Sequence, residues 1–276
     1  MRAGLLAAAA LLGLWASAAQ AGPHDVAIHV TRLGGDTATA QPFLDRFLRH
    51  LEGAIGWPAS SLAGKFLTSR KATTGYLAEV KPGLALLEPP LYFELRQQLQ
   101  LKPVLQVESA ELITPRLHVV VKDPALKALA DLAGKRVCST LGEYPRYLTA
   151  VVLDGQVDAA KAWKLKPVRQ ALKGVRGVLR GECDATTLDD SQLAKAREMT
   201  GGKELRSIHA SAPLPPIPVV VLGDALPAAE RDALVKGLLQ VCDGEKGKAI
   251  CAEMHLTRIV PVDAALFGAA EKKYGG

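Results

Sequence analysis

Apolar and polar residues alternate in short blocks along most of the chain. Asp25–Val30 alternates and is rich in β-branched residues, which predicts a strand. Thr31–Thr37 is polar and contains glycine, and a helix is expected to begin at Pro42, with Phe43, Phe47, Leu48 and Leu51 on one face. Strand, glycine-containing loop and helix in this order indicate the start of an open α/β sheet.

The same alternation continues toward the C-terminus. Apolar runs of strand length alternate with segments of helical spacing, which is typical of α/β folds. Strands are expected near residues 83–87, 104–107, 117–121, 136–138, 165–168 and 183–188, and helices near 73–80, 91–100, 144–153 and 228–241.

A proline-rich segment interrupts this pattern. Residues 213–218 hold four prolines in six positions, which neither a helix nor the interior of a sheet tolerates. The segment near 210–217 therefore predicts an extended crossing between two globular units, followed by a last strand and C-terminal helices. A second crossing is expected near residues 108–117. A chain that leaves one unit, builds another and returns predicts a two-lobed clamp with a hinge.

The N-terminus has the pattern of an export signal. Arg2 precedes an apolar run over Leu5–Trp15, and Ala19-Gln20-Ala21 gives the small-x-small pattern of a cleavage site. The alternative, a membrane anchor, is disfavoured because the run barely reaches spanning length and contains Ser17. We expect residues 1–21 to be removed, the mature chain to start at Gly22, and the protein to work in the periplasm.

Exported chains commonly pair their cysteines, and this chain has four. Cys242 and Cys251 bracket a turn-rich segment and form one expected disulfide. Cys138 and Cys183 lie in strand-like stretches that adjacent strands would bring together, and they form the other. A zinc site is the competing interpretation, but the chain contains no Cys-x-x-Cys pair.

Charge and motifs exclude several function classes. The formal net charge of +6 is scattered without a block of five basic residues, and aromatic residues make up only 5%, so a nucleic-acid partner is not expected. No Gly-x-Gly-x-x-Gly, phosphate loop or Gly-x-Ser-x-Gly is present, so we expect neither a cofactor nor an enzyme. The histidines show no metal-ligand spacing, and we expect no metal site; they are His24, His29, His50, His118, His209 and His255.

Five short motifs, in order along the chain, resemble those of a known family. Asp131–Val137 resembles the element that opens the second lobe of periplasmic solute-binding proteins. The other four resemble elements of the phosphate- and phosphonate-binding (type 2 periplasmic binding protein) branch; they are Gly83–Tyr92, Gly181–Ala185, Ser211–Pro215 and Ile259–Asp263.

The resemblance implies an α/β fold with two lobes, each an open, mostly parallel sheet flanked by helices, and two hinge crossings. Residues 22–112 and 214–276 would form lobe I, and residues 113–213 lobe II. The implied function is capture of a small polar or anionic solute, of a phosphonate or oxyanion-like class, for an inner-membrane ABC permease, by a monomer. The alternatives are a ligand-sensing subunit of a membrane signalling system and, less favoured, a periplasmic enzyme on the same fold.

Loops that follow strands would line the cleft of such a clamp. In the first lobe the candidates follow the first strand and the strand at 84–87, and in the second they open a helix at Pro145 or follow the strand that ends at Asp189. Glu143 could instead be a helix cap, and of Asp189 and Asp190 one is expected to face the cleft and the other to cap the next helix. The candidate ligand-binding residues are Thr31, Gly35, Asp36, Thr37, Glu88, Tyr92, Ser139, Thr140, Glu143, Tyr144 and Asp189.

Overall fold

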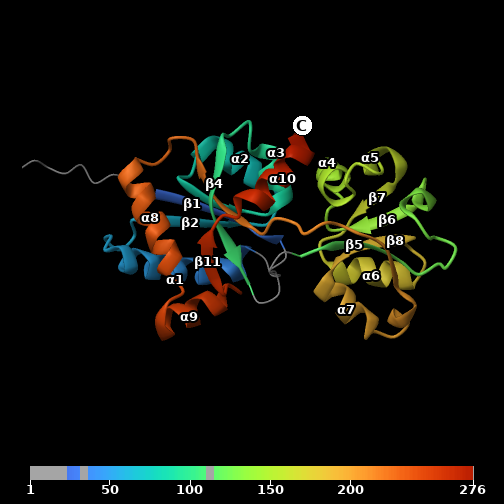
Figure 1. Ribbon diagram of the computed structural model, residues 1–276. Helices are drawn as coiled ribbons and strands as arrows, with labels where there is room; N and C mark the ends of the chain where they lie inside the picture. Colours follow the sequence, from blue (N-terminus) through green and yellow to red (C-terminus); the bar gives the residue numbers. More distant parts are fainter. Residues whose placement is uncertain (1–23, 32–36, 110–114, 276) are drawn as a thin grey trace, which may run out of the picture.

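The computed structural model describes residues 24–31, 37–109 and 115–275. It consists of two sheets, each flanked by helices, which form two lobes side by side (Figure 1). The expected signal segment, Gly22, Gly35, Asp36 and the middle of the first crossing lie outside the described residues.

The first lobe is built on a six-stranded sheet of order β11-β4-β10-β3-β1-β2. Its strands are β1 (His24–His29), β2 (Leu62–Leu67), β3 (Leu84–Leu87), β4 (Leu101–Glu108), β10 (Pro218–Leu222) and β11 (Arg258–Pro261). Its helices are α1 (Thr37–Ile55), α2 (Arg70–Val80), α3 (Pro89–Leu95), α8 (Ala228–Gln240), α9 (Gly244–Glu253) and α10 (Ala264–Gly275).

The second lobe is built on a five-stranded sheet of order β7-β6-β8-β5-β9. Its strands are β5 (Leu117–Val121), β6 (Arg136–Ser139), β7 (Lys164–Pro167), β8 (Ala185–Asp189) and β9 (Arg206–Ala210). Its helices are α4 (Pro145–Tyr147), which continues as a π-helical turn over Leu148–Val152, α5 (Ala159–Ala162), α6 (Ala171–Leu179) and α7 (Asp190–Arg197). Short 3₁₀ turns occupy Leu129–Leu132 and Gly202–Glu204.

The chain passes between the sheets twice. It leaves the first sheet after β4, enters the second at β5, and returns between β9 and β10, through the proline-rich segment. The two-lobed architecture expected from the sequence is therefore confirmed. The expectation of mostly parallel sheets is wrong: β1 pairs in parallel with β2 and β3, and β6 with β7 and β8, whereas the other neighbours pair antiparallel. Four of the five antiparallel pairs involve β10 or β5, which are the first strands after the two crossings and run opposite to their neighbours, and the fifth joins β11 to β4.

Several boundaries differ from the sequence-based expectation. The first helix begins at Thr37, not at Pro42, which lies inside it. Pro42 is exposed there, and its missing N–H removes only one bond near the start of the helix. The apolar pattern did not predict β2, where Gly64 and Lys65 weaken it, and it did not predict β9, of which only Ala210 lies in the segment expected to cross.

The structure confirms both disulfides. Cys138 lies within β6, and Cys183 lies two residues before the neighbouring strand β8. The two residues form a disulfide, with their Cα atoms 5.9 Å apart. Cys242 follows α8 and pairs with Cys251 in α9, with a Cα separation of 5.6 Å. Each bond therefore stays within one lobe.

Three apolar clusters form the core. One fills the space between the first sheet and α1, α8 and α9, and another lies between the second sheet and α6 and α7. The largest covers the opposite face of the first sheet and continues through α3 and α10 into α4 of the second lobe. Apolar packing therefore joins the lobes as well as filling each of them. No helix of the described residues is long and apolar enough to cross a membrane.

Candidate functional site

The carboxyl ends of β1 and β3 meet at one edge of the first sheet because the two strands run in parallel. Glu88 follows β3, and its side chain is only 6% exposed. Its carboxylate accepts hydrogen bonds from the Thr31 backbone N–H at 2.7 Å and from the Thr31 hydroxyl at 2.9 and 2.8 Å. Glu88 therefore fixes the chain as it leaves β1 against the start of α3.

His29, the last residue of β1, also lies at this edge, although it is not among the candidates predicted from the sequence. Its side chain is fully buried, and Nδ1 lies 3.1 Å from the Leu67 carbonyl oxygen and 2.9 Å from the Thr73 hydroxyl. Burial lowers the pKa of His29, although Glu88, the bond to Leu67 and Glu143 act in the opposite direction. The only signal in the sequence was its position at the end of a strand.

The second lobe contributes the turn between β6 and α4. Ser139 ends β6 and is buried; its hydroxyl lies 2.6 Å from that of Thr187 and accepts from the Leu141 N–H at 3.0 Å. Thr140 and Glu143 are exposed on the turn. Tyr144, not Glu143, occupies the N-cap position and Pro145 the first helical position, so the interpretation of Glu143 as a helix cap is wrong.

The edge of the first sheet and the turn of the second lobe meet at Arg70 and Tyr144. Arg70 begins α2, and its guanidinium carbon lies 5.4 Å from the centre of the Tyr144 ring. The same guanidinium forms an ion pair with Glu94 of α3. Burial raises the pKa of Tyr144, and Glu88 adds to the effect, which places the phenol near carboxylates of the first lobe.

The charges around Tyr144 are mainly negative. Glu88, Glu94 and Glu143 all raise the pKa of the phenol, whereas Arg70 lowers it. Arg70 is itself paired with Glu94 of α3. Among the described residues no group of three or more metal-ligating side chains is found.

Three other candidates have structural partners. The hydroxyl of Tyr92 donates to Glu271 of α10 at 2.6 Å, and its side chain is 1% exposed, so it packs inside the first lobe. Thr37 is the first residue of α1. Asp189 caps α7 by accepting from the Gln192 N–H at 2.8 Å, which is the cap role expected of one of the two aspartates.

Asp190, the neighbour of that cap, binds within its own lobe. Its carboxylate lies 2.9 Å from Nε2 of His118 and accepts from the Arg116 N–H at 3.0 Å. Hydrogen bonding to His118 and Arg116 lowers the pKa of Asp190. Asp189, which ends β8, and Asp190, which begins α7, therefore both stabilise local structure.

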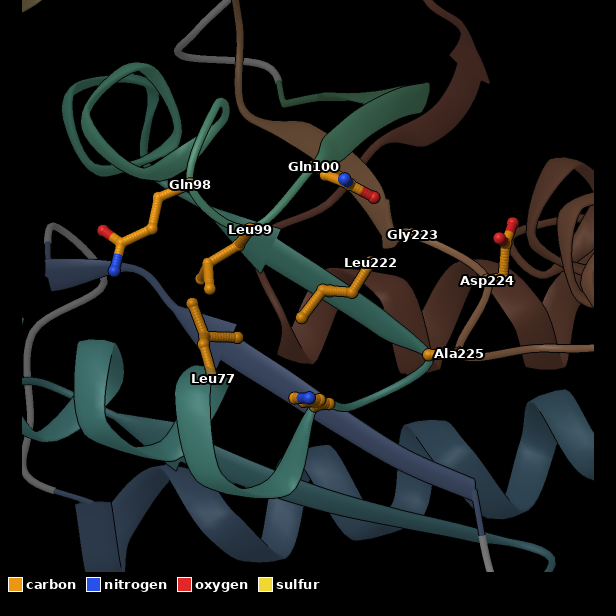
Figure 2. Close-up of a pocket in the computed structure, with 9 residues that line it drawn as sticks. Leu77, Gln98, Leu99, Gln100, Leu222, Gly223, Asp224 and Ala225 are labelled. Atoms are coloured by element: carbon orange, nitrogen blue, oxygen red, sulfur yellow. The ribbon is translucent and has the colours of Figure 1, made fainter.

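A pocket of about 270 Å³ lies at the other end of the first sheet. Figure 2 shows Leu77, Leu99 and Leu222 pointing toward one another at its base, with Gln98 and Gln100 at its margin. β10 runs antiparallel to β3, with Val221 opposite Leu84, so this pocket borders the amino end of β3. It is therefore distant in the fold from Glu88, and it is not part of the candidate site.

Solved structures with the same fold come from several bacteria. XAC2383 from Xanthomonas citri, solved bound to ATP, matches with a TM-score of 0.72 and 17% identity over 90% of this chain and 94% of that one. PA3383 from Pseudomonas aeruginosa, a binding protein component of an ABC phosphonate transporter, matches with a TM-score of 0.65 and 14% identity over 90% and 84%. PhnD1 from Prochlorococcus marinus, in complex with methylphosphonate, matches with a TM-score of 0.63 and 14% identity over 91% and 97%.

These likenesses are structural, and a search of curated protein sequences found no match. The sequence itself matches a family model over residues 44–267, which is most of the chain. That family consists of substrate-binding proteins, not enzymes, and its members work outside the cytoplasm with ABC transporters. The expectation of a solute-binding protein is thereby confirmed. The chain belongs to the family of periplasmic substrate-binding proteins of phosphonate ABC transporters.

Proposed function

We propose that a small polar solute binds between the two lobes, at the carboxyl ends of β1 and β3 and at the turn before α4, and that the loaded protein delivers it to an inner-membrane ABC permease. The observation that carries this proposal is the contact between Arg70 of the first lobe and Tyr144 of the second, 5.4 Å from guanidinium carbon to ring centre. A solute seated there touches both lobes.

Lobe closure is the mechanism that this placement supports. A solute shifts an equilibrium between open and closed forms only by its differential affinity for them, so contacts to both lobes select the closed form. The backbone segments between β4 and β5 and between β9 and β10 act as hinges. The lobes divide near residues 112 and 213, and the protein acts as a monomer after cleavage before Gly22.

Only some of the candidate residues are assigned to contact with the solute. Thr31 and Glu88 contribute from the first lobe, with His29 and Arg70 added from the structure, and Thr140, Glu143 and Tyr144 contribute from the second. Thr140 and Glu143 are exposed on their turn and have room for a solute, whereas the hydroxyl of Ser139 is bound to Thr187. Tyr92 is assigned to the core because it is buried against α10.

The test uses mature protein purified from the periplasm. Native mass spectrometry should find a small solute that leaves on denaturation, and small-angle scattering should show that the emptied protein contracts when the solute is returned. Tyr144→Ala should weaken the contraction, and Leu239→Ala, a change of an exposed residue on α8, is the matched control. A protein that carries no solute and does not contract would contradict the proposal.

A further inference from the structure

The positive charge of the chain is concentrated in one segment of the second lobe. Residues 161–180, which run from the end of α5 through β7 and α6, contain seven basic residues and no acidic residue. The rest of the chain has 27 basic and 28 acidic residues, so this segment carries the whole positive excess. One of the seven, Lys161, forms an ion pair with Asp158. The other six are exposed; they are Lys164, Lys166, Arg169, Lys173, Arg176 and Arg180.

The lysines of β7 lie on one side of the second sheet. β7 is the edge strand beside β6, and Lys166 is opposite Cys138 while Leu165 is opposite Val137. Cys138 packs in the cluster beneath α6, whereas Leu165 and Val137 pack on the other face of the sheet. Side chains alternate along a strand, so Lys166 and Lys164 share the face that α6 covers (Figure 1).

The outer side of α6 continues this surface. The two valines of the helix pack against the sheet. Lys173, Arg176 and Arg180 are exposed on the opposite side of the helix, at spacings of three and four residues. Leu172, which is 42% exposed, lies beside them. We call this surface the basic face; it consists of Lys164, Lys166, Leu172, Lys173, Arg176 and Arg180.

The charges of the basic face do not stabilise the fold. Other cations at the surface have carboxylate partners, as Arg136 has in Asp184. Within residues 24–31, 37–109 and 115–275, no cation of the basic face forms an ion pair. Like charges three and four residues apart on a helix repel, and Lys173 stands in the first turn of α6, where the helix dipole disfavours a positive charge. The arrangement is therefore explained better by an anionic partner than by the fold.

We infer that the basic face binds the anionic headgroups of a lipid bilayer. A bilayer that contains anionic lipid attracts Lys and Arg residues near its surface. Leu172 adds an apolar side chain that enters the boundary between headgroups and acyl chains. The family of this chain works with ABC transporters, which are membrane proteins, so a bilayer surface is present where the protein acts. The inference goes beyond the proposed function, because it involves no solute.

The composition of the basic face favours a lipid surface over a protein partner. Protein interfaces are enriched in aromatic residues that anchor in pockets, and they are depleted in lysine. The one aromatic residue among residues 161–180, Trp163, is only 4% exposed, and three of the five cations of the basic face are lysines. A flexible lysine ammonium acts as a point charge and suits mobile headgroups, which offer no fixed geometry.

Co-sedimentation of the mature protein with vesicles tests the inference. Vesicles of phosphatidylcholine and phosphatidylglycerol should bind the protein, whereas vesicles of phosphatidylcholine alone should not. The binding should be lost when the salt is raised from about 0.1 M to about 1 M, because the Debye length falls from about 10 Å to about 3 Å. Absence of binding, or binding that is independent of lipid charge and salt, would overturn the inference.

A charge variant assigns the binding to α6. Lys173→Gln, Arg176→Gln and Arg180→Gln together remove three charges, and each basic residue strengthens attachment to an anionic surface about fivefold. Affinity for the anionic vesicles should therefore fall about a hundredfold. Equal losses in a matched control would show that net charge alone matters and would overturn the basic face. The control changes three exposed lysines of the first lobe to Gln; they are Lys236, Lys246 and Lys248.

Two further outcomes complete the test. Leu172→Ser, which keeps every charge, should weaken vesicle binding about two- to fivefold, and an unchanged affinity would contradict insertion of this side chain. Binding to the purified permease in neutral detergent but to neither kind of vesicle, lost in the α6 variant, would make the partner a protein and overturn the lipid assignment. The vesicle experiments use no solute, so their failure leaves the proposed function intact, and a protein that does not contract with its solute leaves this inference intact.

Discussion

The two lobes touch through an aromatic contact and a polar contact. In the aromatic contact, the ring of Phe93 in α3 lies 5.5 Å from those of Tyr147 in the second lobe and Tyr274 in α10. In the polar contact, Arg70 lies over Tyr144 among the carboxylates of Glu88, Glu94 and Glu143. Both contacts join the same two lobes, and they differ in whether all of their polar atoms have hydrogen-bond partners.

The aromatic contact needs nothing from outside. Phe93 and Tyr147 are each 2% exposed, and Arg146 donates to the Tyr274 carbonyl at 2.9 Å while it stacks on the Tyr274 ring at 4.6 Å. Lys273 of α10 adds an ion pair of 2.8 Å with Asp154. The polar contact, in contrast, includes the unpartnered Nε2 of His29. The aromatic side is thus a packed contact that holds the lobes together, while the polar side is the place where we propose that the solute binds.

The largest expected effect concerns the aromatic contact. Phe93→Ala should lower the free energy of unfolding by about 3–5 kcal/mol, because a buried aromatic ring is replaced by a cavity. Urea unfolding followed by circular dichroism measures it, and Leu239→Ala, whose residue is 39% exposed, serves as the control. If the two variants unfolded at the same urea concentration, the aromatic contact would not be what holds the lobes together.

The next effect concerns Glu88. Glu88→Ala removes the acceptor of the Thr31 N–H and hydroxyl, and charge-assisted hydrogen bonds of this kind contribute about 1.5–3 kcal/mol. We expect the dissociation constant of the solute found by native mass spectrometry to rise about ten- to a hundredfold. Calorimetry measures the change. Glu79→Ala, on α2, is the control, and equal losses in both variants would show that Glu88 has no special part in binding.

A smaller effect on solute affinity distinguishes the contribution of the Tyr144 ring from that of its hydroxyl. Tyr144→Ala removes the surface on which Arg70 stacks, and a cation–π contact at a partly exposed site contributes about 0.5–1 kcal/mol. Solute affinity should fall roughly two- to fivefold. Tyr144→Phe keeps the ring and should bind like the parent. A loss as large in Tyr144→Phe would assign the effect to the hydroxyl instead of the stacking.

The smallest effect is a pH dependence. The pKa of His29 is lowered in the folded protein from 6.5, so the unfolded chain binds more protons once the pH falls below about 6.5. The stabilisation from neutral His29 is complete above that pH and is lost as the pH falls through the folded pKa. Urea unfolding at about pH 7.5 and about pH 5 should show a steeper loss in the parent than in His29→Asn, and parallel curves would contradict this assignment.

The sequence predicted the architecture better than the site. Strand-length apolar runs and the prolines at 213–218 were enough to predict two α/β lobes. The four cysteines of an expected exported chain, with their positions relative to the predicted strands and turns, predicted both disulfides. The candidates Glu88 and Tyr144 were found because they follow strands. Tyr92, which also follows β3, packs against Glu271 instead, since a residue four positions after Glu88 turns with the helix toward α10.

Local periodicity therefore predicted most of the elements and their order, and the prolines at 213–218 indicated the two lobes, because these signals depend on residues a few positions apart. Only the tertiary structure decided the strand directions, the partner of each carboxylate and the state of His29. Leu67 and Thr73 contact that ring, and Glu88 and Glu143 influence its pKa from other parts of the chain, which no spacing in the sequence indicates. Burial of a histidine and the loss of a partner for its second nitrogen are properties of that arrangement, and they exist only in the folded protein.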